Sequence, residues 1–180
     1  MKILGIDPGV ATTGWGVIEQ VKSPASTRGR LSTRGGQKLK VKSCGCILTS
    51  KKCSQAERLL LIAKEIQKII KMHQPDIVAI EKLFFSKNLK TAMAVSEARG
   101  AILTACASKG LPIYEFTPLE VKMAITGYGR AEKKQIQKMV KTILGLKDQP
   151  KQDDLADALA CAICCSNSLK MRTLRHANLK

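Results

Sequence analysis

Two apolar runs in this chain end on a carboxylate, and both have the pattern of a buried strand. Ile3, Leu4 and Ile6 precede Asp7, after which Pro8-Gly9 turns the chain. The run 76–81 is also apolar and closes on an acid. Short apolar runs bounded by turn residues are typical of strands buried on both faces. The pattern therefore predicts strands at 2–7 and 76–81, each with an acidic side chain at its carboxyl end.

The first third of the chain alternates between strand-like and loop-like composition. Thr13–Glu19 and Val41–Thr49 have strand composition, and with the first strand they predict an antiparallel three-stranded meander. Between them, Val21–Lys40 is rich in Ser, Thr, Gly and Pro and carries six Lys or Arg residues but no acid. Such a segment buries little apolar surface. We predict that it is a flexible, basic insertion in the hairpin between the second and third strands.

A helix is predicted between the meander and the strand that ends at Glu81. Ser54 and Glu57 form a capping-box pattern, and apolar residues then recur at helical spacing until Gln74-Pro75. A helix that connects two strands of one sheet favours a right-handed crossover with parallel strands. Asp7 and Glu81 should therefore lie at the same edge of the sheet, where open α/β sheets place their sites.

The remaining segments complete an α/β pattern. They predict a fifth strand at 111–116, helices at 89–109, 118–126, 131–144 and 153–166, and a basic tail at 167–180. We expect one α/β domain over residues 1–166, because the elements alternate along a single chain of domain size. Its core would be a five-stranded mixed sheet, with the antiparallel meander joined by two parallel strands and flanked by helices.

Asp154 and Asp157 lie in the first turn of the last predicted helix. Because they are three residues apart, they share one face of that helix, and carboxylates in a first turn also suit the helix dipole. The rest of the helix is almost wholly apolar, so it is expected to pack on the sheet. Two interpretations are open: a pair of capping acids, or two ligands of a cation.

The charge of the chain bears on its partners. It carries 31 Lys and Arg residues against 14 Asp and Glu, a formal net charge of +17. Such an excess predicts a polyanionic partner, either nucleic acid or an anionic membrane surface, although a solvated basic face is the plainer explanation. No apolar run approaches the roughly 18 residues of a membrane-spanning helix, and no signal peptide is evident. We expect a cytoplasmic protein without a membrane partner.

The acids that end the two strands and begin the last helix suggest a chemistry. The predicted fold would gather four carboxylates, which suit Mg²⁺ or Mn²⁺ rather than zinc. Two such ions about 4 Å apart can activate a water and stabilise the leaving oxygen in phosphodiester cleavage. Together with the basic charge, this favours a metal-dependent nuclease.

Several short motifs, spread over nearly the whole chain, carry a family resemblance. They are Ile3–Gly9 with Gly14-x-Gly16, Ala79-Ile80-Glu81-x-x-Phe84, Glu97-Ala98-Arg99-Gly100, Val121-Lys122, Gly127-x-Gly129-x-Ala131-Glu132-Lys133 and Asp154–Ala160. In these motifs the chain resembles the RuvC family of bacterial Holliday-junction resolvases, which have a ribonuclease-H-like fold. The resemblance implies a homodimeric, Mg²⁺-dependent endonuclease, with Mn²⁺ as a substitute. Such enzymes nick two opposing strands of four-way junction DNA in recombination and repair, with the RuvA–RuvB branch-migration complex.

The resemblance also implies roles for individual residues. The four that match the family's catalytic, metal-binding acids are Asp7, Glu81, Asp154 and Asp157. Phe84 matches an aromatic residue at the junction centre, and Lys122 and Lys133 match lysines that face the DNA backbone. Asp153 directly precedes Asp154, but only Asp154 has the family's spacing to Asp157. The basic segment 21–40 is longer than the hairpin expected in this family.

The predicted helix 89–109 offers a surface for the dimer. Small residues recur on it at helical spacing and would allow another helix to approach closely. They are Ala92, Val95, Ala98, Ala101, Ile102 and Ala105. The alternative is that this face packs only on the sheet of its own monomer.

Two other functions are compatible with parts of the sequence. The opening Gly5-Ile6-Asp7-x-Gly9 also begins actin-like and sugar-kinase-like ATPase domains. Those proteins need a second, similar domain, for which 180 residues are few. A nucleic-acid-binding module of the same fold that no longer cleaves is the other alternative, and the presence of all four acids argues against it.

Overall fold

The computed structural model describes residues 1–22, 37–83, 89–150 and 152–177. Five strands form one sheet in the order β3-β2-β1-β4-β5. The strands are β1 (Lys2–Asp7), β2 (Thr12–Lys22), β3 (Gln37–Leu48), β4 (Ile77–Glu81) and β5 (Ile113–Phe116). β1, β2 and β3 pair antiparallel, whereas β4 is parallel to both β1 and β5. The predicted five-stranded mixed sheet is thus confirmed.

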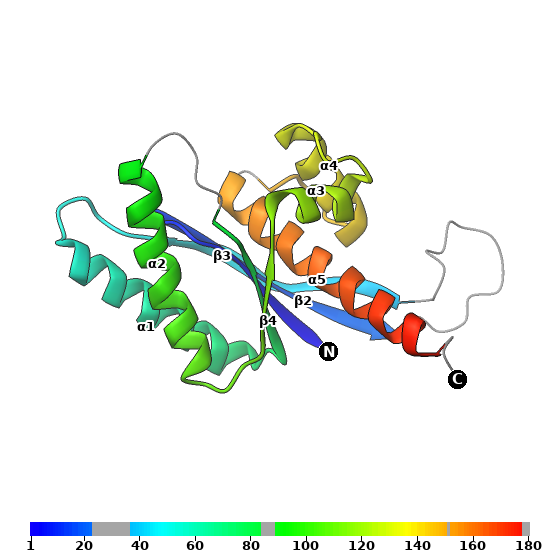
Figure 1. Ribbon diagram of the computed structural model, residues 1–180, viewed down its shortest axis with the longest axis horizontal. Coiled ribbons are helices and arrows are strands. Elements are labelled where there is room, and N and C mark those ends of the chain that lie inside the picture. The colour runs from blue at the N-terminus through cyan, green and yellow to red at the C-terminus, as the bar shows by residue number, and fades with distance from the viewer. Residues whose placement is uncertain (23–36, 84–88, 151, 178–180) are drawn as a thin grey trace.

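Helices cover both faces of the sheet (Figure 1). They are α1 (Gln55–His73), α2 (Leu89–Ala107), α3 (Pro118–Thr126), α4 (Lys133–Leu144) and α5 (Asp153–Ala177). Successive residues of a strand point to opposite faces, so Leu4 and Ile6 pack with α1 and α2, whereas Ile3 packs with α3, α4 and α5. This period of two explains why the apolar runs are continuous. Within the described ranges, no helix has the length and apolarity to cross a membrane.

The hairpin of β2 and β3 is longer than predicted. Residues 21–22 and 37–40 belong to the paired strands β2 and β3, in which Val21 lies opposite Lys38. The predicted bounds of the loop, 21 and 40, were therefore wrong at both ends. The strand continues here because apolar residues alternate with lysines. Leu39 and Val41 lie on the inner face and pack against the core beside α5. Residues 23–36, where the rest of the predicted insertion falls, lie outside the described residues.

The last helix also continues beyond its predicted end. α5 runs to Ala177, so most of the predicted tail 167–180 is helical, and residues 178–180 lie outside the described residues. The sequence predicts that the helix ends at the polar residue Ser166. Ser166 is buried instead, and its hydroxyl accepts a hydrogen bond from Gln20 Nε2 at 2.8 Å. No glycine or proline interrupts the chain there.

The proposed dimer face of α2 is largely internal. Ala98, Ile102 and Ala105 are buried in the core that α1 and α2 form with the sheet. These three residues therefore cannot contact a second subunit, and the prediction was wrong for them. The other three predicted residues are half-buried, and their part in a dimer stays a prediction. The small side chains serve close packing within the monomer.

Candidate functional site

Asp7 and Glu81, two of the predicted site residues, lie side by side at the ends of adjacent strands. In the parallel pairing of β1 and β4, Ile6 lies opposite Ile80, and Asp7 and Glu81 are the next residues of the two strands. Both acids therefore lie at the carboxyl edge of the sheet. The crossover through α1, predicted from the order of the elements, produces this arrangement.

Glycines in β1 and β2 allow α5 to lie directly on the sheet. A Cβ atom at Gly5 would come within 2.1 Å of the Ala158 carbonyl oxygen, and one at Gly14 within 2.0 Å of the Asp154 carbonyl oxygen. No side chain fits at either position unless the helix moves. The glycines therefore place the first turn of α5, with both of its candidate acids, beside the end of β1.

The carboxylates at this edge influence one another. Burial, followed by the charges of Asp157, Glu81 and Asp154, raises the pKa of Asp7 to about 8. Burial, followed by the charge of Asp157, raises the pKa of Glu81 to about 7. Burial also raises the pKa of Asp157. The four acids thus form one cluster in which deprotonation of each opposes that of its neighbours.

Two lysines face the cluster from the neighbouring helices. Lys133 Nζ lies 3.6 Å from Asp157 Oδ2, and the positive charge of Lys122 lowers the pKa of Glu81. A pocket of about 180 Å³ is lined by these two lysines together with Glu81 and Asp157. A basic rim around an acidic centre can bind a phosphate next to a cation.

Asp153 has a different environment from Asp154. Its carboxylate lies 3.2 Å from Lys133 Nζ and accepts a hydrogen bond from Gln137 Nε2 at 2.6 Å, so it is directed toward α4. Both acids raise the pKa of Asp157, but only Asp154 is among the charges that raise the pKa of Asp7. These contacts favour Asp154 as the member of the cluster. Phe84, the predicted aromatic residue, lies outside the described residues.

Sequence reasoning missed the residues that position the acids. Arg99 of α2 donates a hydrogen bond from Nε to the Glu81 carbonyl oxygen at 3.4 Å. Its Nη2 forms an ion pair with the carboxylate of Glu115 in β5. It thereby ties the ends of β4 and β5 together. Glycines inside predicted strands were a usable signal for close helix approach. Nothing in the spacing of Arg99 pointed to its partners.

The donor set suits a hard divalent cation. Four carboxylates outnumber the two lysines beside them. The raised pKa values of Asp7, Glu81 and Asp157 reflect burial and mutual negative charge, and an ion would neutralise that charge. In the side-chain conformations of this structure, however, no three Asp, Glu, His or Cys side chains of the described residues are grouped to hold a metal ion. Mutual repulsion and the contact of Asp157 with Lys133 oppose such grouping, so an ion would have to draw the carboxylates together.

Comparisons with known proteins agree on one family. Residues 3–165 match the sequence model of the family described as Crossover junction endodeoxyribonuclease RuvC. A relative of that description from Caldicellulosiruptor saccharolyticus is 52% identical over 164 residues, which are 91% of each chain. Thermus thermophilus RuvC superposes with a TM-score of 0.82 and 33% identity over 96% of this chain and 98% of that one.

A second solved structure shows T. thermophilus RuvC in complex with Holliday junction substrate. It superposes with a TM-score of 0.81 and 30% identity over 95% of this chain and 96% of that one. Because these matches extend over nearly the whole chain, they confirm the ribonuclease-H-like fold that the sequence motifs implied.

Proposed function

Because the chain belongs to the RuvC family of crossover junction endodeoxyribonucleases, we propose that it resolves Holliday junctions by paired nicks in two opposing strands. One observation carries the proposal: four carboxylates cluster at the carboxyl edge of the sheet in a chain of net charge +17. The cluster suits a metal-dependent hydrolysis, and the basic surface suits DNA. No second, similar domain accompanies it in the described residues, so nothing favours an actin-like or kinase-like ATPase.

In this proposal Asp7, Glu81, Asp154 and Asp157 hold Mg²⁺, for which Mn²⁺ can substitute. The bound metal would activate a water and stabilise the leaving oxygen. Glu81 and Asp7 come from strand ends, and Asp154 and Asp157 from a helix seated on glycines, so the backbone brings all four acids to one edge and the ion would draw their side chains together. Asp157 would exchange Lys133 for the metal, which frees that ammonium to bind a DNA phosphate.

The DNA contacts are assigned by charge and by the family resemblance. Lys122 and Lys133 bind backbone phosphates beside the scissile bond, because both line the pocket that contains Glu81 and Asp157. Phe84 stacks on bases at the junction centre, where each base stacked on an aromatic ring is worth about 1–3 kcal/mol. Arg99 acts as a positioning residue, since its Nε donates a hydrogen bond to the backbone carbonyl oxygen of Glu81.

The test of the proposed function is junction cleavage with binding measured in parallel. A synthetic four-way junction should be cut in Mg²⁺ or Mn²⁺ but not in EDTA. Asp7→Asn and Glu81→Gln should each reduce cleavage at least about 10³-fold, while junction affinity persists because lysines and arginines supply it. Full cleavage in EDTA, or ATP hydrolysis in its place, would refute the proposal.

The proposed homodimer follows from the symmetry of the junction. A four-way junction in its open form is approximately two-fold symmetric, so a homodimer presents one site to each of two equivalent strands. In the cytoplasm it would act with the RuvA–RuvB complex in recombination and repair. A mixed dimer of wild-type and Asp7→Asn subunits should nick one strand and leave the opposing strand whole. A monomer on junction DNA, or two cuts by the mixed dimer, would contradict this assembly.

A further inference from the structure

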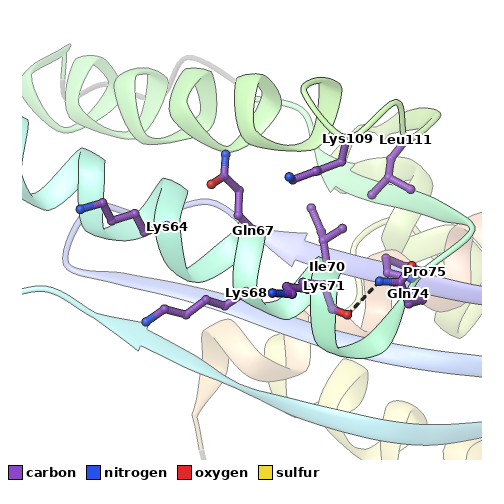
Figure 2. A pocket seen from close by; sticks show the side chains of 9 residues that line it. All are labelled: Lys64, Gln67, Lys68, Ile70, Lys71, Gln74, Pro75, Lys109 and Leu111. Carbon is purple, nitrogen blue, oxygen red and sulfur yellow. Dashed lines mark hydrogen bonds between the residues drawn. The ribbon is translucent and has the colours of Figure 1, made fainter.

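A second pocket, of about 490 Å³, lies at the opposite edge of the sheet from the carboxylates. It is formed by the C-terminal half of α1 and by the loop from α2 into β5 (Figure 2). Pro75 precedes β4 and Leu111 precedes β5, so the pocket adjoins the amino ends of the two strands. The proposed cleavage chemistry, at their carboxyl ends, does not use it.

Four lysines surround this pocket. Lys64, Lys68 and Lys71 lie on one face of α1, and Lys109 extends toward them from the end of α2 (Figure 2). Among the residues that the structure describes, no acid lines the pocket. Lys68 pairs with Glu65 at 2.5 Å, whereas the other three form no ion pair within the described part of the chain. Three of the four lysines therefore carry a positive charge that has no ion-pair partner among the described residues.

The helix dipole explains only part of this charge. Lys71 lies in the last turn of α1, where a cation suits the partial negative charge of the helix end. Lys64 and Lys68 lie in earlier turns, beyond the range of that effect. A solvated helix face would also carry lysines, but it would not place them around a concave site with a fourth lysine on the other side.

The floor of the pocket is apolar. Ile70 is 6% exposed, Pro75 is buried and Leu111 is half-buried. The amide of Gln67 points from α1 toward α2 above this floor (Figure 2). A volume of about 490 Å³ is in the range of small-ligand sites, which combine apolar walls with a few polar groups. The matching ligand is an anion with a flat apolar part and a hydrogen-bonding edge.

We propose that this pocket binds a nucleoside phosphate unit. Its phosphates contact the lysines, its base lies on Ile70 and Leu111, and Gln67 pairs with the edge of the base, as glutamine amides do. A free nucleotide and a single strand of nucleic acid present the same chemistry. A DNA duplex does not, because its bases are stacked inside and cannot reach the floor.

Calorimetric titration of the full-length protein in EDTA tests this proposal with three probes: dATP, pyrophosphate and a short oligothymidylate. Lys71→Gln/Lys109→Gln should weaken dATP binding about tenfold or more, the loss of two charged contacts. Lys51→Gln/Lys52→Gln removes the same charge from the turn between β3 and α1, outside the pocket, and should change binding less than about twofold. Leu111→Ser should weaken dATP but not pyrophosphate.

Each outcome decides the matter. If the oligothymidylate binds more tightly than dATP and loses affinity in the pocket variant, the ligand is a nucleic-acid strand; the reverse order identifies a free nucleotide. Equal affinity for pyrophosphate and dATP, equal losses in the two double variants, or no binding would overturn the proposal. Tighter binding of a duplex or of an acidic peptide at the same lysines would also overturn it. Junction cleavage by the pocket variant should be unchanged, so failure here leaves the proposed nuclease function intact.

Discussion

The carboxyl edge of the parallel strands holds four acids in a partly buried cluster, whereas the amino edge holds four lysines around an open pocket. Both edges carry charge that the ion pairs of the described residues neutralise only in part. At the carboxyl edge, burial couples that charge to the folding equilibrium, because deprotonation of Asp7 and Glu81 is opposed in the folded state. At the amino edge, the lysines are exposed to solvent. Changes of charge should therefore affect stability at the first edge and only ligand binding at the second.

Apart from removal of the acids themselves, the largest effect is expected where the acidic cluster depends on backbone contact. Gly14→Ala would place a Cβ atom 2.0 Å from the Asp154 carbonyl oxygen, so α5 must shift and carry its acids with it. A displacement of about 1 Å at a catalytic group can reduce the rate about 10²-fold. We expect that loss in junction cleavage at saturating enzyme.

Gly16→Ala is the matched control, two residues along the same strand. Its Cβ atom would meet the side chain of Leu159, at 2.5 Å from Cδ2, and not the backbone of α5. A side chain can rotate, so the helix can keep its place, and cleavage should fall by less than about fivefold despite some loss of stability. Equal losses of cleavage in the two variants would show that the glycines do not position the acids.

The second effect is the pH dependence of stability, which should come from the acidic cluster and not from the lysines. In the unfolded chain Asp7 titrates near 3.8, and in the folded protein its pKa is about 8. Between these values the folded state binds more protons than the unfolded state, so the free energy of unfolding without metal should fall as pH rises from about 4 to about 8. Asp7→Asn should remove much of this slope and, above pH 8, stabilise the metal-free protein by up to about 5 kcal/mol, since each pKa unit of the shift is worth about 1.4 kcal/mol.

Denaturant unfolding in EDTA at several pH values measures this slope. Mg²⁺ binds the deprotonated acids, so its stabilising effect at a fixed concentration should be larger at about pH 9 than at about pH 6. Lys71→Gln, which removes a charge from the open edge, should leave the slope as in the wild type. A metal-free protein that becomes more stable between pH 5 and about 8 would contradict the buried-cluster account.

The smallest effect on cleavage is expected for Asp153, the sequence neighbour of Asp154. Asp153 faces Lys133 and Gln137, whereas Asp154 belongs with Asp7. Asp153→Asn should therefore change junction cleavage by less than about threefold, the range of an exposed ion pair. Asp154→Asn should abolish cleavage. The reverse order of effects would mean that the first turn of α5 is assigned one residue out of place.

Much of the acidic edge could be predicted from the sequence, because its signals are local. Apolar runs that end on Asp7 and Glu81 predict both the strands and the position of the acids, and the intervening helix predicts their parallel arrangement. The extent of β2 and β3 was not predictable from composition, because the lysines in 37–40 obscure the alternation of Leu39 and Val41.

The lysine pocket was not predictable because it depends on tertiary packing. Lys64, Lys68 and Lys71 have the helical spacing of an ordinary solvated face. Lys109 joins them only because α1 packs against α2, which brings segments far apart in the sequence into contact. Similarly, the pairing of Arg99 with Glu115 follows from the position of α2 beside β5. Neither arrangement leaves a periodic pattern.

Electron paramagnetic resonance of bound Mn²⁺ tests whether the four carboxylates at the carboxyl edge of the sheet share a divalent metal site. The wild-type protein should bind Mn²⁺ in competition with Mg²⁺. Asp7→Asn, Glu81→Gln, Asp154→Asn and Asp157→Asn should each weaken binding at least about tenfold. Asp153→Asn should bind as the wild type does. Retention of Mn²⁺ by the Asp7 and Asp154 variants, or its loss in the Asp153 variant alone, would contradict the account.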